Sequence, residues 1–308
     1  MIWAITLLAV VALAAAAPLA ERLRPAIRRA TRNPDGWRLI RLSQGMTAYR
    51  WDGPVTGPVV VCVHGLTTPA LVWDAVVRGL VLMGFRVLRY DLYGRGLSDR
   101  PGGAQDRAFF LTQLRDLLHA QAVAGRFMLI GYSMGGAIAT AFAAAWPARV
   151  ERLVLLAPSG LGHQASRAER FITRVPGLGD WLMLLLGGVL LRRAIGRAAL
   201  APSAVEGLYA AQMHETRMRG FLPAVLSSRR HMLSEDMEPC HRAIAAQKIP
   251  VLAIWGKADP VIPLSALGRL AQINPAARQE MVEEAGHGLP YTHPGQVHAA
   301  LQSFLRDA

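Results

Sequence analysis

Lysine, cysteine and acidic side chains are scarce in this 308-residue sequence. Only Lys248 and Lys257 represent lysine, so arginine dominates the 34 basic residues, which against 21 acidic ones leave a net charge of +13. The two cysteines, Cys62 and Cys240, are too few for a disulfide framework and give no sign of an oxidising compartment. Charged residues make up only 18% and hydrophobic residues 52% of the sequence. That balance excludes a disordered chain, which lacks apolar surface to bury, and the length fits one large α/β domain or two small ones.

The segment 2–20 carries no charged residue and consists mainly of leucine, valine, isoleucine and alanine. At 1.5 Å per residue, a helix of this length spans roughly 28 Å, close to the hydrocarbon thickness of a bilayer. We therefore expect a retained single-pass membrane anchor over residues 1–36, including a basic flank. The alternative is a cleavable signal peptide, because alanines 14–17 offer small residues for cleavage. Against it, no basic residue precedes the apolar run, and the run is longer than the apolar core of most signal peptides.

Arginines follow the apolar segment at once, and they explain part of the basic excess. The flank contributes +5 to the net charge through Arg22, Arg24, Arg28, Arg29, Arg32, Arg38 and Arg41 against Glu21 and Asp35. Basic residues beside a span favour the cytoplasmic side, and each gains about 1 kcal/mol next to anionic headgroups. We therefore predict a bacterial inner-membrane protein whose main body lies in the cytoplasm. We expect no nucleic-acid partner, because the other arginines are scattered and no basic groove with interleaved aromatic residues is evident.

Beyond residue 36 the sequence reads as a single α/β domain over 37–308. Continuous apolar runs typical of strands buried on both faces occur at 59–63, 85–90, 127–132, 153–157 and 251–255. Helical patterns lie between them at 71–83, 109–123 and 135–146. This alternation predicts a mostly parallel central sheet flanked by helices. Between about 161 and 242 the pattern is helical only, which predicts a helical cap inserted over the sheet edge.

Residues 131–135 read Gly-Tyr-Ser-Met-Gly, directly after an apolar strand and before a helical pattern. In that context the G-x-S-x-G pattern indicates a sharp strand-to-helix turn that lifts the Ser133 hydroxyl out of the sheet. The flanking glycines leave room for the turn, and the helix that follows directs its N-terminal N–H groups at a reacting oxygen. The five-residue pattern also occurs by chance in a chain with 29 glycines. Its position between strand and helix makes Ser133 the candidate nucleophile.

A nucleophilic serine needs a base, and the base needs an orienting acid. Asp259 lies in the turn after the apolar strand 251–255, and His287 lies in a glycine-flanked loop before the last helical pattern. Both follow strand ends, where ligands of open α/β sheets bind. No Asp or Glu lies between residues 152 and 167 to serve as a rival acid. The other histidines have no comparable flanks, and no metal-ligand spacing emerges among them: His119, His163, His214, His231, His241, His293 and His298.

Two backbone amides should complete the site as an oxyanion hole. The Met134 amide, directly after the nucleophile, is one expected donor. The Leu66 amide, in the loop after strand 59–63, is the other. We interpret the neighbouring His64 as support for this loop, because a histidine in a tight turn at a strand end has a structural role more often than a catalytic one.

Five segments together give the chain from 37 to 308 its resemblance to the alpha/beta-hydrolase superfamily: 64–66, 91–98, 131–136, 255–259 and 285–287. The resemblance implies the alpha/beta-hydrolase fold with a helical cap, a Ser133–Asp259–His287 triad and no cofactor or metal. It implies that the segment from Asp91 to Ser98 is a structural loop near the site. Members with an aspartate nucleophile, such as epoxide hydrolases and haloalkane dehalogenases, do not match because a serine occupies the turn.

The cap should select the substrate. It contains an uncharged run of eleven residues, 181–191, followed by Arg192 and Arg193. This run is too short to span a bilayer, and we expect a buried cap helix. A helix that contacts lipid is the alternative, and either one gives an apolar acyl pocket. A carboxylic ester hydrolase for hydrophobic or lipid-derived acyl chains is the preferred hypothesis. Three alternatives stay open: a carbon–carbon bond hydrolase, a cofactor-free haloperoxidase or perhydrolase, and a non-catalytic membrane-tethered accessory protein.

Overall fold

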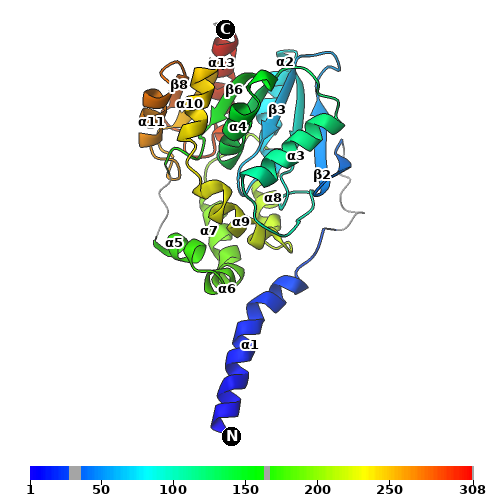
Figure 1. Ribbon diagram of the computed structural model, residues 1–308, viewed down its shortest axis with the longest axis vertical. Coiled ribbons are helices and arrows are strands. Elements are labelled where there is room, and N and C mark those ends of the chain that lie inside the picture. The colour runs from blue at the N-terminus through cyan, green and yellow to red at the C-terminus, as the bar shows by residue number, and fades with distance from the viewer. Residues whose placement is uncertain (28–35, 163–166, 307–308) are drawn as a thin grey trace.

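The centre of the molecule is an eight-stranded sheet, seen in a computed structural model that describes residues 1–27, 36–162 and 167–306 (Figure 1). The strands follow one another across the sheet in the order β1-β2-β4-β3-β5-β6-β7-β8. Their bounds are β1 Arg38–Leu42, β2 Gly45–Asp52, β3 Val59–Val63, β4 Arg86–Tyr90, β5 Phe127–Tyr132, β6 Val150–Leu156, β7 Val251–Gly256 and β8 Arg278–Val282.

From β4 to β8 all neighbouring strands are parallel, whereas β1 and β2 are antiparallel additions at one edge. The central strands β5 and β7 are buried along their full length, as their continuous apolar sequences require when helices cover both faces. The expectation of a mostly parallel sheet flanked by helices is thus confirmed. The three strands that the sequence did not reveal are β1, β2 and β8.

Helices cover both faces of the sheet (Figure 1). On one face, α2 packs against α13 and α12. On the other, α4 packs against β5 and β6, with α3 and α10 beside it and α11 next to α10. The bounds of these elements, with two short 3-10 turns, are η2 Ala70–Trp73, α2 Asp74–Leu82, α3 Arg107–Ala120, α4 Met134–Ala145, η3 Pro147–Arg149, α10 Glu238–Ala246, α11 Ser265–Ile273, α12 Leu289–Thr292 and α13 Pro294–Arg306.

Between β6 and α10 the described chain forms helices and no strand, and we call this segment the cap. Its elements are α5 Arg167–Arg174, α6 Leu178–Leu182, the π-helical turn η4 Met183–Gly187, α7 Gly188–Ala198, α8 Leu208–Glu215, α9 Phe221–Arg230 and the 3-10 turn η5 Met232–Ser234. A small apolar cluster around Phe221, Leu222 and Met183 holds α9 and η4 together. The expected buried helix over 181–191 is only half buried, because Leu185, Leu186 and Leu190 are exposed.

The N-terminal helix α1 (Ile2–Leu23) projects from the body beside the cap (Figure 1). It is the helix in the described chain that is long and apolar enough to cross a membrane; its mean hydropathy is 2.3 and 6% of its apolar window is buried. A signal sequence would have the same properties. The expected flank is divided: Arg28, Arg29, Arg32 and Asp35 lie outside the described residues, and Arg38 and Arg41 belong to the edge strand β1.

Candidate active site

Ser133 occupies a strained turn between β5 and α4. Its backbone angles are φ 54° and ψ −118°, a conformation that a residue with a side chain rarely adopts. The neighbouring glycines permit the turn. A Cβ atom on Gly131 would lie 2.3 Å from the Gly135 carbonyl oxygen, and one on Gly135 would lie 2.1 Å from the Val63 carbonyl oxygen. The turn therefore excludes side chains on both sides of Ser133 and directs its hydroxyl into the space above the sheet.

The structure brings Ser133, His287 and Asp259 into one hydrogen-bonded chain. The Ser133 Oγ lies 2.9 Å from His287 Nε2, and His287 Nδ1 lies 2.8 Å from Asp259 Oδ2. The tautomer that carries its proton on Nδ1 satisfies both bonds, because Nδ1 then donates to the carboxylate and Nε2 accepts from the hydroxyl. His287 stands at the end of the loop after β8, and Asp259 follows β7, so both reach the site from strand ends.

The Asp259 carboxylate is fixed from its other side. Its Oδ1 accepts hydrogen bonds from the backbone amides of Val261 at 2.7 Å and Ile262 at 3.0 Å. The side chain of Asp259 is 2% exposed, whereas that of His287 is 22% exposed. The acid is thus buried and held by three hydrogen bonds, while the imidazole meets the pocket.

The amides of Leu66 and Met134 both lie at the site with no hydrogen-bond acceptor among the described residues. Met134 opens α4, so its amide precedes the first intrahelical hydrogen bond. Leu66 lies in the loop after β3, and its carbonyl accepts a 2.9 Å hydrogen bond from Arg95 Nε. A pair of unpartnered amides next to a serine hydroxyl can bind the oxygen of a polarised carbonyl.

Arg95 joins this loop to the cap. Its guanidinium is fully buried and donates to the carbonyls of Leu66 and Tyr93, to Ser228 Oγ at 2.8 Å and to the Ala224 carbonyl. Burial lowers the pKa of Arg95 to about 9. The sequence suggested only a structural loop from Asp91 to Ser98. Asp91 fits that interpretation, because its buried carboxylate accepts hydrogen bonds from the amides of Ala70 and Leu97. The bridge from Arg95 to the cap had no signal in the sequence.

His64 supports the loop. Its Nδ1 lies 2.8 Å from the Gly65 carbonyl oxygen, and its Nε2 accepts a 2.8 Å hydrogen bond from the Leu92 amide. Burial lowers its pKa to about 3, so the ring is neutral at physiological pH. A buried, neutral imidazole with both nitrogens engaged holds two loops together and has no free nitrogen for proton transfer.

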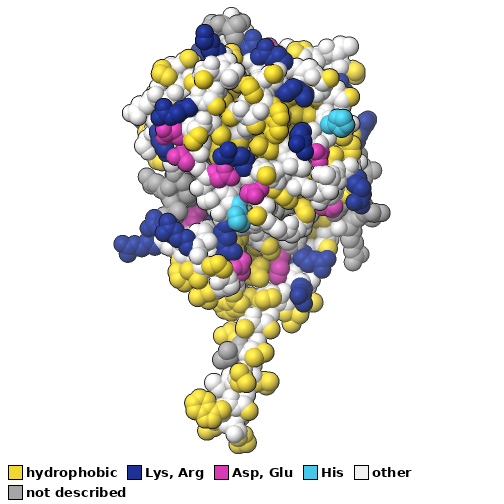
Figure 2. Space-filling view, in the orientation of Figure 1, with side chains coloured by type: hydrophobic (Ala, Val, Ile, Leu, Met, Phe, Trp, Pro, Cys, Tyr) yellow, Lys and Arg dark blue, Asp and Glu magenta, His cyan; other side chains and the backbone are white. Residues whose placement is uncertain are grey.

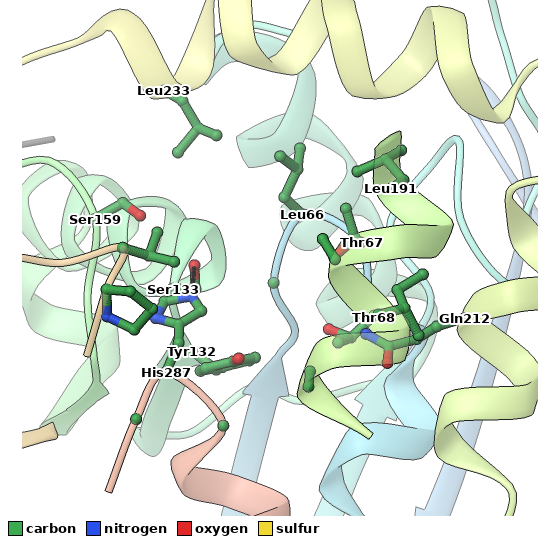
Figure 3. A pocket seen from close by; sticks show the side chains of 18 of the residues that line it. Leu66, Thr67, Thr68, Tyr132, Ser133, Ser159, Leu191, Gln212, Leu233 and His287 are labelled. Atoms are coloured by element: carbon green, nitrogen blue, oxygen red, sulfur yellow. Dashed lines mark hydrogen bonds between the residues drawn. The ribbon is translucent and has the colours of Figure 1, made fainter. Parts of the chain in front are cut away.

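A cavity of about 1000 Å³ lies between the sheet and the cap and contains Ser133 and His287 in its lining. Figure 3 shows Leu66, Leu191 and Leu233 around the space next to these two side chains. Its polar lining includes Thr67, Thr68, Ser159 and Gln212. The volume suits a ligand of drug or fatty-acyl size.

Basic residues from the cap line the same cavity. They are Arg170 and Arg174 of α5, Arg197 of α7, and Arg229 and Arg230 of α9. Arg229 pairs with Glu169, and Arg230 pairs with Asp180 at 2.8 Å. Arg174 and Arg197 have no carboxylate partner within the part of the chain that the structure describes. The cavity thus combines an apolar wall with two cations available to an anionic group.

Tyr132 packs against the catalytic histidine candidate in a way that the sequence did not reveal. The Tyr132 ring lies 5.3 Å from the His287 ring, and Tyr209 and Tyr291 pack edge to face at 5.9 Å. Burial raises the pKa of Tyr291 to about 12, so its hydroxyl is neutral at physiological pH. Tyr132 directly precedes the serine in the motif, and only the fold shows that its ring reaches the imidazole.

Comparisons with known proteins identify the family of this chain. A model described as "Alpha/beta hydrolase family" matches residues 60–300. Lipase 1 of Psychrobacter immobilis is 26% identical, over 78% of this chain and 74% of its own. The 2-hydroxy-6-oxononadienedioate/2-hydroxy-6-oxononatrienedioate hydrolase of Comamonas testosteroni is 27% identical, over 81% and 88%.

Solved structures share the fold. A hydrolase from Pseudomonas aeruginosa superposes with a TM-score of 0.73 at 27% identity, and the match covers 89% of this chain and 99% of that one. The family model spans most of the chain, including the serine turn, the Asp259 turn and the His287 loop. On the strength of that match, this chain belongs to the alpha/beta hydrolase family.

Proposed function

We propose that the protein is a serine hydrolase that cleaves carboxylic esters through a Ser133–His287–Asp259 triad and an acyl-enzyme. The observation that carries the proposal is the hydrogen-bonded chain from Ser133 Oγ through both nitrogens of His287 to Asp259. That chain opens into a cavity large enough for an acyl group. Lipases among its relatives support the same chemistry.

In the first half-reaction, Ser133 Oγ attacks the acyl carbon while its proton moves to His287 Nε2. The carboxylate of Asp259 stabilises the imidazolium that forms. The amides of Leu66 and Met134 donate to the oxyanion, and each such donor contributes about 3–4 kcal/mol to the transition state. The carbon–oxygen bond to the alcohol then breaks, and the alcohol oxygen takes the proton from His287. In the second half, water attacks the acyl carbon and His287 accepts its proton. The bond between that carbon and Ser133 Oγ then breaks, His287 returns the proton to Oγ, and the acid leaves.

The cavity favours esters with an apolar acyl chain. Leu66, Leu191 and Leu233 present hydrocarbon to the space beside Ser133, and Ile195 and Val261 also line it. Burying one methylene in such a wall gains about 0.8 kcal/mol, so longer chains should raise kcat/KM until the wall ends.

The test is hydrolysis of p-nitrophenyl esters from acetate to palmitate by the detergent-solubilised full chain. We expect activity that rises with chain length and disappears in Ser133→Ala. Ser265→Ala, at the exposed start of α11, is the matched control and should behave as wild type. Turnover that survives Ser133→Ala would refute the role of Ser133.

A carbon–carbon bond hydrolase is the second candidate, and the arginines of the cavity favour it. The Comamonas relative is named for hydrolysis of a dienedioate, a substrate with two carboxylates. Arg174 and Arg197 could bind such a group. Loss of the dienol absorbance of a 2-hydroxy-6-oxo-dienoate, with no ester turnover, would identify this reaction in place of ester hydrolysis.

We also propose that α1 is a retained anchor with the hydrolase domain on the cytoplasmic side. α1 contacts the cap on both sides of the alanines at 14–17, because Trp181 Nε1 donates a 3.1 Å hydrogen bond to the Leu13 carbonyl before them and further contacts follow after them. Glu21 is buried, pairs with Arg24 at 2.9 Å and accepts a 2.6 Å hydrogen bond from the Gly220 amide. Arg24 Nη1 also donates to the Thr216 carbonyl at 2.6 Å. Edman sequencing of the membrane fraction should begin at the first residues of the chain; a start after the alanines at 14–17 would indicate a cleaved signal peptide.

A further inference from the structure

The cap exposes large apolar side chains on one continuous stretch of chain, from α5 to α7. We call these residues the apolar cap face: Phe171, Leu178, Leu185, Leu186, Val189 and Leu190. Each is at least 40% exposed, and four of them follow one another at helical spacing along η4 and α7. Figure 2 shows apolar side chains gathered at the end of the body from which α1 projects. Such a patch on a folded domain marks a contact with another apolar surface.

The apolar cap face lies next to α1. Both α6 and η4 pack against this helix. The Trp181 indole Nε1 donates a 3.1 Å hydrogen bond to the Leu13 carbonyl, and Ala17 is 3% exposed. The rest of α1 leaves its leucines in the open, as Leu7 at 65% and Leu8 at 73% exposure show. The exposed apolar surface of α1 therefore adjoins the cap elements α6 and η4 that carry part of the apolar cap face.

The contact between Trp181 and α1 determines how deep the cap lies relative to the hydrocarbon boundary of the bilayer. The first charged residue after the apolar segment is Glu21, so the hydrocarbon boundary lies near residue 20 when α1 spans a bilayer. Leu13 lies seven residues earlier along the helix, roughly 10 Å deeper at 1.5 Å per residue. Interfacial helices bury their apolar faces about 5–10 Å into the boundary between headgroups and acyl chains. The cap therefore lies at a depth where its exposed leucines contact the boundary between headgroups and acyl chains.

The charges around the patch fit an anionic lipid surface. The cap segment from α5 to α7 carries six arginines and two acidic residues, Arg167, Arg170, Arg174, Arg192, Arg193 and Arg197 against Glu169 and Asp180. Both acids pair with arginines of α9. The exposed side chains of Arg167 and Arg193, which do not line the cavity, would face headgroups, which attract arginine close to the surface.

We infer that the apolar cap face is immersed in the bilayer interface beside α1, so that the cap forms part of the membrane surface of the protein. This inference rests on the proposal that α1 spans the membrane. The helices that carry the face also line the catalytic cavity with Thr173, Leu191 and Ile195. The cavity wall then lies next to lipid, and the substrate class becomes amphiphilic esters that dissolve in the bilayer.

The test measures depth with a fluorophore on single cysteines. The native Cys62 and Cys240 are 0% and 5% exposed, so a maleimide reagent should label the introduced position. The variants are Leu186→Cys and Leu190→Cys in the cap face, Leu7→Cys in α1, and Leu82→Cys, which is 89% exposed on α2. Each full chain carries an NBD label and is reconstituted into phosphatidylcholine–phosphatidylglycerol vesicles with nitroxide-labelled phosphatidylcholine. Circular dichroism checks that each variant is folded.

We expect nitroxide quenching at Leu186→Cys and Leu190→Cys that is several-fold stronger than at Leu82→Cys, with a blue-shifted emission. Quenching at Leu7→Cys alone would overturn the inference and leave the anchor proposal intact. Absence of quenching at all cap and α1 positions would overturn both. Equal quenching at Leu186→Cys and Leu82→Cys would also contradict the inference, because it would show contact without a preferred face.

Discussion

The backbone conformation of Ser133 is energetically unfavourable for any residue with a side chain. The chain is packed so closely at the neighbouring glycines that the turn cannot relax to another conformation. Strain of this kind costs about 1–3 kcal/mol and persists only where the surrounding packing imposes it. Here α4 and β3 impose it, since Gly135 lies against the Val63 carbonyl. The stability of the turn therefore depends on the absence of two side chains.

Gly135→Ala should destabilise the fold by about 1–3 kcal/mol, because its Cβ would overlap the β3 backbone. Chemical denaturation gives the free energy of unfolding. Gly268→Ala is the matched control: no atom lies within 4 Å of its Cβ position in α11. It should stabilise the helix by about 1 kcal/mol. Equal effects of the two substitutions would refute the steric account.

Asp259→Asn should lower kcat for esters by about 10⁴-fold with little change in the fold, because an amide favours the wrong imidazole tautomer. Steady-state kinetics on the ester found best in the chain-length series provides the measurement. Glu283→Gln removes an acid from an exposed pair with Lys257 and should leave kcat unchanged. A decrease below tenfold for Asp259→Asn would exclude the proposed orienting role.

His241 should make stability depend on pH. Its ring is buried in α10, neither nitrogen has a hydrogen-bond partner among the residues that the structure describes, and burial lowers its pKa to about 4 from an ordinary 6.5. The folded state keeps it neutral, so the unfolded state binds more protons below pH 6.5. The free energy of unfolding should therefore fall as pH falls from 6.5 to 4, with a contribution of up to about 1.4 kcal/mol per pH unit.

His241→Leu should remove this contribution. Urea denaturation of wild type and variant across pH 4–8 would show curves that converge or cross above pH 6.5 and separate below it. His64 contributes a parallel slope in both proteins, because its pKa is also lowered. Identical slopes would show that His241 gains no proton on unfolding.

At the scale of elements, the contact between α1 and the cap determines how firmly this helix is attached to the body. The buried Glu21 carboxylate forms an ion pair with Arg24 and accepts a hydrogen bond from the Gly220 amide. Glu21→Ala should therefore expose the chain after Arg22 and Arg24 to trypsin in detergent micelles. Glu206→Ala, at an exposed cap position, should leave the cleavage rate unchanged. Equal trypsin sensitivity of both variants would contradict the docking contact.

The strands that the sequence predicted are those buried on both faces, since burial there requires continuous apolar runs. β8 escaped notice because its residues are all partly exposed, and Arg278 and Glu280 within it pair with each other. β1 and β2 form the antiparallel edge, where polar side chains interrupt the apolar pattern. The sequence favoured a buried helix over 181–191 and left a lipid-contact helix as the alternative, because an apolar run does not indicate what covers it.

At the scale of the whole molecule, the sequence indicated the candidate site because Ser133 and Asp259 follow predicted strands and His287 lies in a glycine-flanked loop, which the structure places after the unpredicted strand β8. Ser133, Asp259 and His287 were each chosen from local context, and parallel strands bring such positions to one edge. The contacts between distant residues that support them could not be predicted in the same way. Arg95 reaches Ser228 across 133 positions, and Tyr132 reaches His287 across more than 150. Contacts of that kind depend on how the cap packs against the rest of the domain, which local sequence patterns do not indicate.

The net charge of +13 belongs to several parts of this architecture. Arg38 and Arg41 lie on β1, and six arginines lie on the cap stretch beside α1. In the proposed membrane orientation, the basic surface nearest the lipid is therefore formed by the cap together with Arg22 at the end of α1.

The central claim is that Ser133 is an activated nucleophile, and a fluorophosphonate probe tests it most directly. Such reagents react with serines that a neighbouring base deprotonates. We predict one covalent adduct, located on the peptide that contains Ser133 by mass spectrometry and absent in Ser133→Ala. Labelling of wild type at another serine, or none at all in a folded protein, would contradict the account and favour a non-catalytic accessory role.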